Sequence, residues 1–204
     1  MDTTKFNLIH FGDNCAPGIL INDILKIKKK QLFMLGVYPF NDILKYLQKN
    51  NLHEIYDKKY LKKTKDNITN HLLYNFTFNH DYVYDGSCNI INYEFVKERF
   101  KVKIKIYDDM FKQNALNIFI NFTNDVDNLN IKDFLHLYKN KIKFHLIIFT
   151  NNDYVDINND FISVIRLKNS YENWWAMHPT LKNILYNEIY FQNTKILNNI
   201  IIKN

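Results

Sequence analysis

The second half of the chain alternates between short apolar runs and amphipathic segments. Apolar runs typical of buried strands cover residues 116–122, 144–150 and 161–167, and such continuous hydrophobicity is expected where both faces of a sheet are covered. Apolar residues at helical spacing occur over 131–138 and 179–190. This alternation predicts an α/β fold with a mostly parallel sheet, flanked by helices in three layers.

The first half of the chain adds elements with weaker patterns. We expect strands over 5–12 and around 74–78, and helices over 17–30, 41–50 and 92–113. Asn41 is the candidate cap of the helix over 41–50, and Lys101–Ile106 also alternates as a strand would. Residues 51–90 are polar in large part, which indicates an insertion or an irregular region. The length fits a single domain over 1–204.

Composition and charge narrow the classes of partner. Lysine supplies nearly all of the net charge of +6, and arginine occurs only at Arg99 and Arg166. Because base and phosphate recognition usually depends on the arginine fork, we do not expect a nucleic-acid partner. No apolar run reaches the ~18–20 residues of a membrane span, so no membrane partner is expected either.

The two cysteines and the amino-acid composition indicate the cellular compartment and the kind of source genome. The N-terminus lacks the pattern of a signal peptide, which favours free thiols at Cys15 and Cys88 in a reducing cytoplasm. Asparagine, isoleucine, lysine and tyrosine are abundant, as expected for an AT-rich genome such as that of a large DNA virus, a parasite or a low-GC bacterium. If the source is viral, the compartment is the host cytoplasm.

Cys15 is the first candidate for chemistry. It lies in Gly12-Asp13-Asn14-Cys15, between the first predicted strand and the first predicted helix. Asp13 or Asn14 can cap that helix, which would place Cys15 in its first turn. Helix N-termini can lower a cysteine pKa from ~8.5 to about 3.5–7.5. Cys15 is therefore either an activated nucleophile or a small residue that packs the strand against the helix.

A cysteine nucleophile needs a base, and His80 is the best candidate. It closes a predicted strand and is followed by Asp81. Because adjacent side chains on a strand point to opposite faces, Asp81 is not expected to orient the His80 ring. The orienting residue would be Asp13, Asn14 or Asn41. The alternative for His80 is a histidine at the surface or satisfied by local contacts.

Two further histidines compete with this assignment. His178 follows Trp174 and Trp175, whose bulky rings could wall a substrate pocket or could simply pack in the core before a helix. His10 is close to Cys15 in sequence, but its side chain is expected to be buried in the sheet layer. Sequence spacing alone does not decide between these histidines.

Metal and cofactor sites find little support in the sequence. There is no Cys-x-x-Cys and no His-Glu-x-x-His, the spacings that hold structural or catalytic zinc. Four scattered glycines form neither a phosphate loop nor a dinucleotide motif. We therefore expect neither a metal nor a cofactor.

Three short motifs carry a family resemblance. Phe-Gly-Asp-Asn-Cys at 11–15, Tyr-Pro-Phe-Asn at 38–41 and Asn-His-Asp at 79–81 occur in order, followed by a lysine-rich helix and the strand Asn117–Asn121. With these motifs the chain resembles an uncharacterised family labelled papain-like cysteine peptidases, found in bacteria and large DNA viruses, over roughly residues 5–170. The resemblance implies that Cys15 is the family's cysteine and His80 its histidine.

The chain departs from that family at two places. Asn41 stands where the family usually has aspartate, and asparagine can orient a histidine without supplying a charge. Lysines such as Lys103 and Lys105 occupy the helix where the family usually has an arginine pair, and lysine cannot form the bidentate fork of arginine. The predicted parallel sheet is also unlike a papain fold, so the likeness concerns a cysteine at a helix start.

The first function considered is that of a cysteine hydrolase acting on an amide, isopeptide or ester of a protein or peptide substrate. Cys15 would attack the carbonyl carbon, and His80 would act first as base and then as acid. Backbone N–H groups of Cys15 and its neighbours would hold the oxyanion. This hypothesis requires Cys15 to be accessible and more reactive than Cys88.

Two other functions stay open. The chain could be a non-catalytic module of viral origin that binds a protein or a glycan through the aromatic loops at Tyr82–Tyr84 and Trp174–Trp175. It could also be an α/β transferase on sugars or nucleotides, in which Asp153 or Asp156 holds substrate or metal after a strand. Activity that depends on metal and survives loss of Cys15 would favour the transferase.

Overall fold

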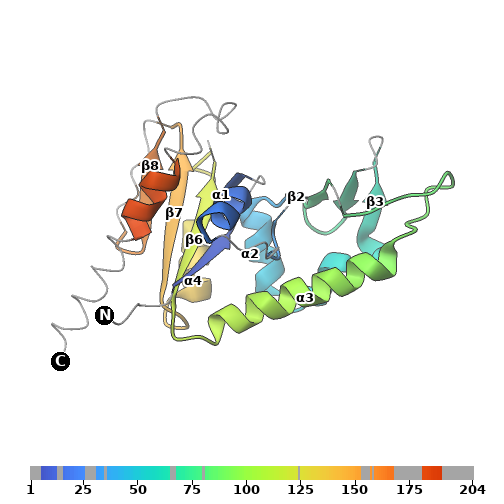
Figure 1. Cartoon of the computed structure of the whole chain (residues 1–204), viewed down its shortest axis with the longest axis horizontal. Coiled ribbons are helices and arrows are strands. Elements are labelled where there is room, and N and C mark those ends of the chain that lie inside the picture. Colours follow the sequence, from blue (N-terminus) through green and yellow to red (C-terminus); the bar gives the residue numbers. More distant parts are fainter. Residues whose placement is uncertain are drawn as a thin grey trace.

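A parallel four-stranded sheet forms one part of the computed structural model (Figure 1). Its strands lie in the order β1 (Phe6–His10), β6 (Leu116–Phe122), β7 (Phe144–Thr150) and β8 (Ile162–Arg166). All three pairings are parallel, so the four carboxyl ends meet at one edge of the sheet. Both central strands are buried along their whole length, which confirms the prediction from their continuous apolar runs.

The structure describes ten segments of the chain. These are residues 6–12, 16–25, 31–34, 36–64, 68–79, 81–123, 125–152, 157, 159–167 and 181–189.

Helices pack on both faces of the parallel sheet. On one face, α1 (Ala16–Leu25) and a helical segment at 181–189 share an apolar cluster with β1, β6 and β7. On the other face, α4 (Ile131–Tyr138) and α2 (Phe40–Gln48) belong to a larger cluster rich in phenylalanine and tyrosine. The prediction of a mixed α/β fold, with helices flanking a parallel sheet, is confirmed.

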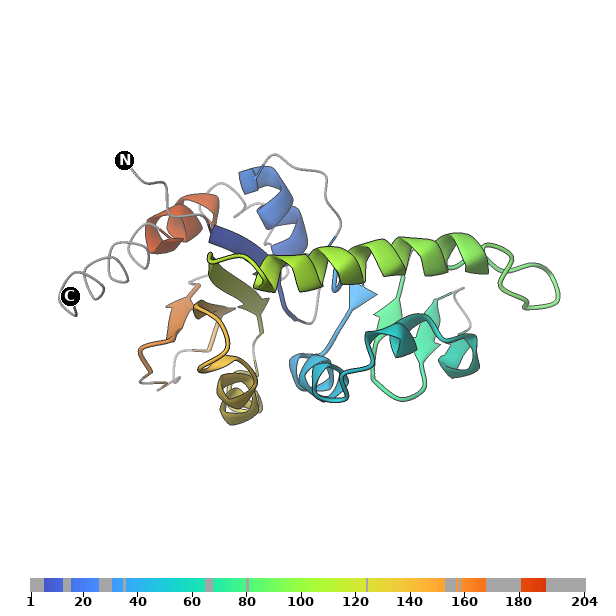
Figure 2. The ribbon, with the colours of Figure 1, turned by 90° about the horizontal axis from the view of Figure 1, so that it is seen from below.

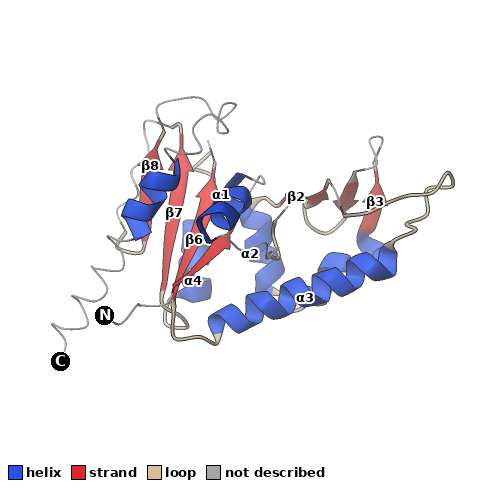
Figure 3. Ribbon diagram, in the orientation of Figure 1, coloured by secondary structure: helices blue, strands red, loops and turns tan. Residues whose placement is uncertain are grey.

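A second, antiparallel sheet lies beside the first (Figure 3). Its strands have the order β2 (Gly36–Val37), β5 (Thr77–Phe78), β4 (Thr69–His71) and β3 (Leu61–Lys63). Two 3-10 helices, η1 (Leu52–Tyr56) and η2 (Lys58–Tyr60), directly precede β3. Residues 51–90, expected to be an insertion or an irregular region, thus contain η1, η2 and the strands β3, β4 and β5. These strands are too short and too polar to show a periodic pattern in the sequence.

The long helix α3 (Tyr93–Phe111) runs beneath the antiparallel sheet and ends beside the lower edge of the parallel sheet, as Figures 1 and 2 show from two directions. Its buried residues are Val96, Phe100, Lys103, Ile104 and Tyr107, which recur at helical spacing. The alternative of a strand over 101–106 is thus excluded. At ~1.5 Å per residue such a helix is about 28 Å long, enough to link the two sheets as one rigid rod.

Several predicted boundaries shift. The helix α2 begins one residue early, at Phe40, with Pro39 at its N-cap, so Asn41 lies inside the first turn and does not cap it. The helix predicted over 17–30 is observed over Ala16–Leu25, and residues 26–30 lie outside the described residues. Among the described residues, no helix combines the length and hydropathy needed to cross a membrane.

Candidate functional site

Most sequence-predicted site residues lie outside the described residues. These are Asp13, Asn14, Cys15, His80, Asp153, Asp156, Trp174, Trp175 and His178. The structure does describe the segments that flank Cys15 and His80, and these flanks define the candidate site.

The turn that leads from β1 toward Cys15 is packed tightly against β6. A Cβ atom on Gly12 would lie 2.0 Å from Nδ2 of Asn121. That amide is buried and donates a hydrogen bond of 2.7 Å to the carbonyl oxygen of Phe11. Only glycine fits at position 12 without displacing this hydrogen bond, so β6 fixes the chain three residues before Cys15.

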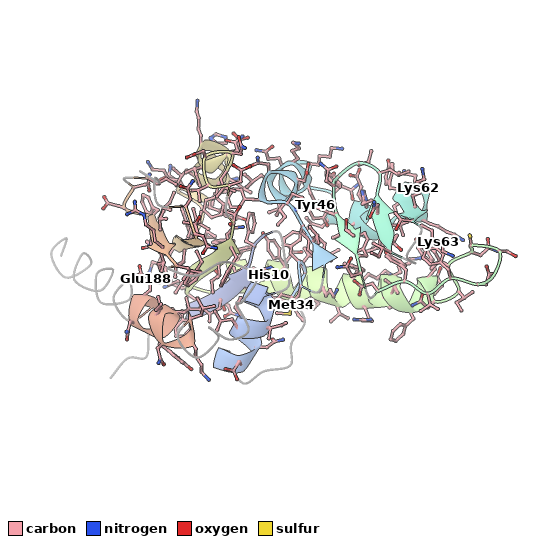
Figure 4. The ribbon with its side chains drawn as sticks, turned by 90° about the horizontal axis from the view of Figure 1, so that it is seen from above. His10, Met34, Tyr46, Lys62, Lys63 and Glu188 are labelled. Atoms are coloured by element: carbon pink, nitrogen blue, oxygen red, sulfur yellow. The ribbon has the colours of Figure 1, made fainter. Side chains whose placement is uncertain are left out.

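His10 is fully buried at the end of β1, as the sequence predicted. Its Nδ1 would lie 3.2 Å from a Cβ atom on Gly18, in the first turn of α1, and Cγ of Met34 would lie 2.6 Å from the same position. Figure 4 shows His10 and Met34 together beside α1. Glycine at position 18 therefore lets both side chains approach the start of the helix that directly follows Cys15.

The segment 31–34 is bound to the backbone of β1. Oε1 of Gln31 accepts a hydrogen bond of 2.8 Å from the backbone N–H of His10, and its Nε2 donates to the carbonyl oxygen of Leu8. Nδ2 of Asn22, on α1, lies 3.7 Å from the sulfur of Met34. Gln31 thus takes the place of a neighbouring strand along this edge of the sheet.

The same segment reaches the flank of His80. The strand β2 begins two residues after Met34, and its Gly36 pairs with Phe78, the last residue of β5 and two residues before His80. Ring contacts follow the same path, with Phe33 and Tyr38 centroids 5.6 Å apart and Tyr38 and Phe78 centroids 6.0 Å apart. Residues 31–34 and 36–38 therefore pack against the flanks of both Cys15 and His80.

Asp81, which follows His80, is turned toward α3. Its side chain is 2% exposed, with Oδ1 3.6 Å from Arg99 and 3.7 Å from Nζ of Lys103. The Lys103 side chain is itself only 3% exposed, and its ammonium lies 4.2 Å from the ring centre of Phe100. Of the two lysines compared with the family's arginine pair, Lys103 is thus buried and paired with Asp81.

Two tyrosines border this charged group. Burial raises the pKa of Tyr38 well above its ordinary value, and the negative charge of Asp81 raises it further. The pKa of Tyr82 is raised by the same two causes, burial first. Both hydroxyl groups therefore stay protonated and act as neutral dipoles beside Asp81.

Asn41 has partners other than a histidine. Its Nδ2 donates a hydrogen bond of 2.8 Å to the carbonyl oxygen of Asn128, and its Oδ1 accepts one of 2.8 Å from the backbone N–H of Asn130. Asn130 caps α4 by accepting from the backbone N–H of Asp133. In this structure Asn41 ties α2 to the start of α4.

The aromatic loop at Tyr82–Tyr84 offers little ring surface. Tyr82 is buried, and the hydroxyl of Tyr84 lies 2.6 Å from that of Thr69. The ammonium of Lys63 stands 5.0 Å from the centre of the Tyr84 ring. Of the three loop residues, only Val83 is largely exposed, so the rings serve packing.

Cys88, the other cysteine, is exposed and free. Nζ of Lys63 lies 3.6 Å from its sulfur. Because the side chain is exposed, an alkylating reagent in solution can reach this thiol. Among the described residues, no group of three or more histidine, cysteine, aspartate or glutamate side chains is placed to hold a metal ion.

No family model matches the chain, and neither a curated protein nor a solved structure matches it.

Proposed function

We propose that the protein is a cysteine hydrolase acting on an amide, isopeptide or ester of a protein or peptide substrate, with Cys15 as nucleophile and His80 as base. One observation supports it above the others: residues 31–38 contact the start of α1 through Met34 and pair with the end of β5 through Gly36. The chain that follows Cys15 and the chain that precedes His80 are therefore both in contact with this segment.

The position of Cys15 in the chain suits a nucleophile. It directly precedes the ten-residue helix α1 and follows a strand of the parallel sheet. Helix starts supply unpaired N–H groups and a positive dipole end, which stabilise a thiolate and the oxyanion formed when it attacks a carbonyl. The carboxyl edge of an open α/β sheet is also where such folds place their sites.

His80 carries the proton in each step of the proposed reaction. The imidazole takes the thiol proton of Cys15, and the thiolate attacks the carbonyl carbon to form a tetrahedral oxyanion. As that intermediate collapses, the imidazolium gives its proton to the departing amine or alcohol and a thioester is left on Cys15. Water then attacks the thioester with His80 again as base, which releases the acid and restores the thiol. This chemistry needs a reduced thiol, as in a cytoplasm.

The test is the rate of alkylation of Cys15 by iodoacetamide as a function of pH, in a Cys88→Ala background. We expect rapid alkylation well below the ordinary thiol pKa of ~8.5, and loss of that reactivity in His80→Ala. His136→Ala is the matched control, because His136 is an exposed histidine on α4. It should leave the profile unchanged.

Two results would contradict the proposal. An ordinary thiol titration in the parent protein would remove Cys15 as nucleophile. Retained reactivity in His80→Ala, together with its loss in a folded His10→Asn variant, would transfer the role of base to His10, whose ring lies against the first turn of α1.

A further inference from the structure

The solvent side of α3 carries a group of exposed apolar side chains. Phe95 and Val102 are each more than half exposed, and their spacing of seven residues places them on one face of the helix. Val83 and Ile91 are exposed to a similar degree beside the start of α3, where the backbone N–H of Ile91 donates to the carbonyl oxygen of Val83. We call these four residues the α3 patch. Single exposed apolar residues are ordinary, but a group of them on one surface marks an interaction site.

A row of four charged side chains borders the α3 patch. Glu94 and Glu98 lie in the N-terminal half of α3, and Lys101 and Lys105 follow in its C-terminal half. The spacing of four, three and four residues keeps all four on one side of the helix. Their side chains are 44–76% exposed. The row therefore runs along the patch with its acidic half first and its basic half second.

The contacts that these charges make within the chain leave them able to exchange partners. Lys101 pairs with Glu98 at 2.6 Å, and Lys105 pairs with Asp109 at 2.6 Å. Exposed pairs on one helix are worth only about 0.3–0.5 kcal/mol, so a contact with another chain can replace them. Figure 2 shows α3 unobstructed along its length when the molecule is seen from below.

We propose that the α3 patch is the contact surface of a homodimer, in which α3 of one copy packs antiparallel on α3 of a second copy. In that arrangement Glu94 and Glu98 of each copy face Lys101 and Lys105 of the other. A parallel arrangement would instead place acidic residues against acidic ones and basic against basic. The surface is thus self-complementary in charge, which is what a two-fold interface requires.

The size of the surface sets the expected strength of the dimer. The contact is confined to α3 and the loop beside its start, which places it at the small end of the range for specific interfaces. We therefore expect monomer and dimer to exchange, with a dissociation constant of about 1–100 μM. This association needs no reactive thiol, so it is independent of the proposed hydrolase activity.

Sedimentation equilibrium of the full chain over about 1–200 μM measures this exchange. Dithiothreitol is present because Cys88 is exposed and could form a disulfide between copies. We expect the mass to rise from monomer toward dimer, and Phe95→Gln to raise the dissociation constant at least about tenfold. Leu72→Gln is the matched control, because Leu72 is as exposed but lies between β4 and β5, outside the patch. It should leave the dissociation constant unchanged.

Charge reversal tests the orientation. The double variant Lys101→Glu with Lys105→Glu makes the row wholly acidic, and Glu94→Lys with Glu98→Lys makes it wholly basic. At low salt each variant alone should be monomeric, and an equimolar mixture of the two should form dimers. Circular dichroism confirms that each variant is folded.

Three results would overturn the proposal. A parent chain that stays monomeric over the whole concentration range would assign the patch to a different partner. A dimer that survives Phe95→Gln would place the interface elsewhere on the molecule. Unchanged dimerisation in the two charge-reversed variants would contradict the antiparallel pairing.

Discussion

Gly12→Ala tests whether the turn before Cys15 is as tightly packed as the structure shows. The new Cβ would lie 2.0 Å from Nδ2 of Asn121, more than 1 Å closer than van der Waals contact allows, so the amide must move. Moving it breaks a buried hydrogen bond of 2.7 Å to the carbonyl oxygen of Phe11. An unsatisfied buried carbonyl costs about 1–3 kcal/mol, and overpacking adds about 1–3 kcal/mol.

Gly12 also has a φ of 158°, a backbone conformation that residues with a Cβ rarely adopt, so alanine adds strain of about 1–3 kcal/mol. We therefore expect Gly12→Ala to lower the free energy of unfolding by at least about 3 kcal/mol, measured by urea denaturation at constant slope. In an Asn121→Ala background the clash is absent and only the backbone strain remains, so adding Gly12→Ala should cost at least about 1 kcal/mol less than in the parent protein. Equal costs in the two backgrounds, or a cost near zero in the parent protein, would refute the reasoning.

Three further predictions concern buried polar groups. Lys103→Met alone leaves the charge of Asp81 buried without its closest buried partner and should lower the free energy of unfolding by about 3–5 kcal/mol, whereas adding Asp81→Asn should restore most of it; calorimetry of both variants checks this. Burial lowers the pKa of His71 below its ordinary value of 6.5, so the unfolded chain binds the proton more readily. Stability should then fall as the pH drops below about 6.5, and urea titrations of the parent and His71→Phe should differ in this slope. Tyr107→Phe leaves the hydroxyl of Tyr138 without its 2.8 Å partner and should cost about 1–3 kcal/mol, while the double phenylalanine variant should be nearly neutral in thermal denaturation.

The parallel sheet was predictable because its signal is local. Residues 116–122, 131–138 and 144–150 form elements with the bounds expected from the sequence. Strands covered on both faces are apolar at most positions, so their pattern depends little on which residues they meet. The second sheet carries no such signal, since β2 and β5 have two residues each. Their pairing depends on contacts between distant segments.

The candidate site was predictable only in part, for a related reason. The burial of His10 follows from its strand, but its contact with the first turn of α1 depends on how that helix crosses the sheet. From the sequence alone, Lys103 is expected to be one of several solvated lysines on α3. Its spacing from Phe100 and Tyr107, three residues after one and four before the other, places it on the buried face. That spacing is the signal from which the ion pair could have been anticipated.

The distribution of glycine gives an independent reason to place the site between β1, α1 and β5. The chain has four glycines, and a Cβ at Gly86 would meet nothing within 4 Å. At Gly12, Gly18 and Gly36 a Cβ would come within 2.0–2.6 Å of another atom, which for Gly36 is the carbonyl oxygen of Thr77. Glycine inside a helix or strand costs roughly 0.5–1 kcal/mol relative to alanine, so close approach must compensate at Gly18 and Gly36. Three of the four glycines thus lie on the path that joins the flank of Cys15 to the flank of His80, where the proposed reaction would require the chain to be held most closely.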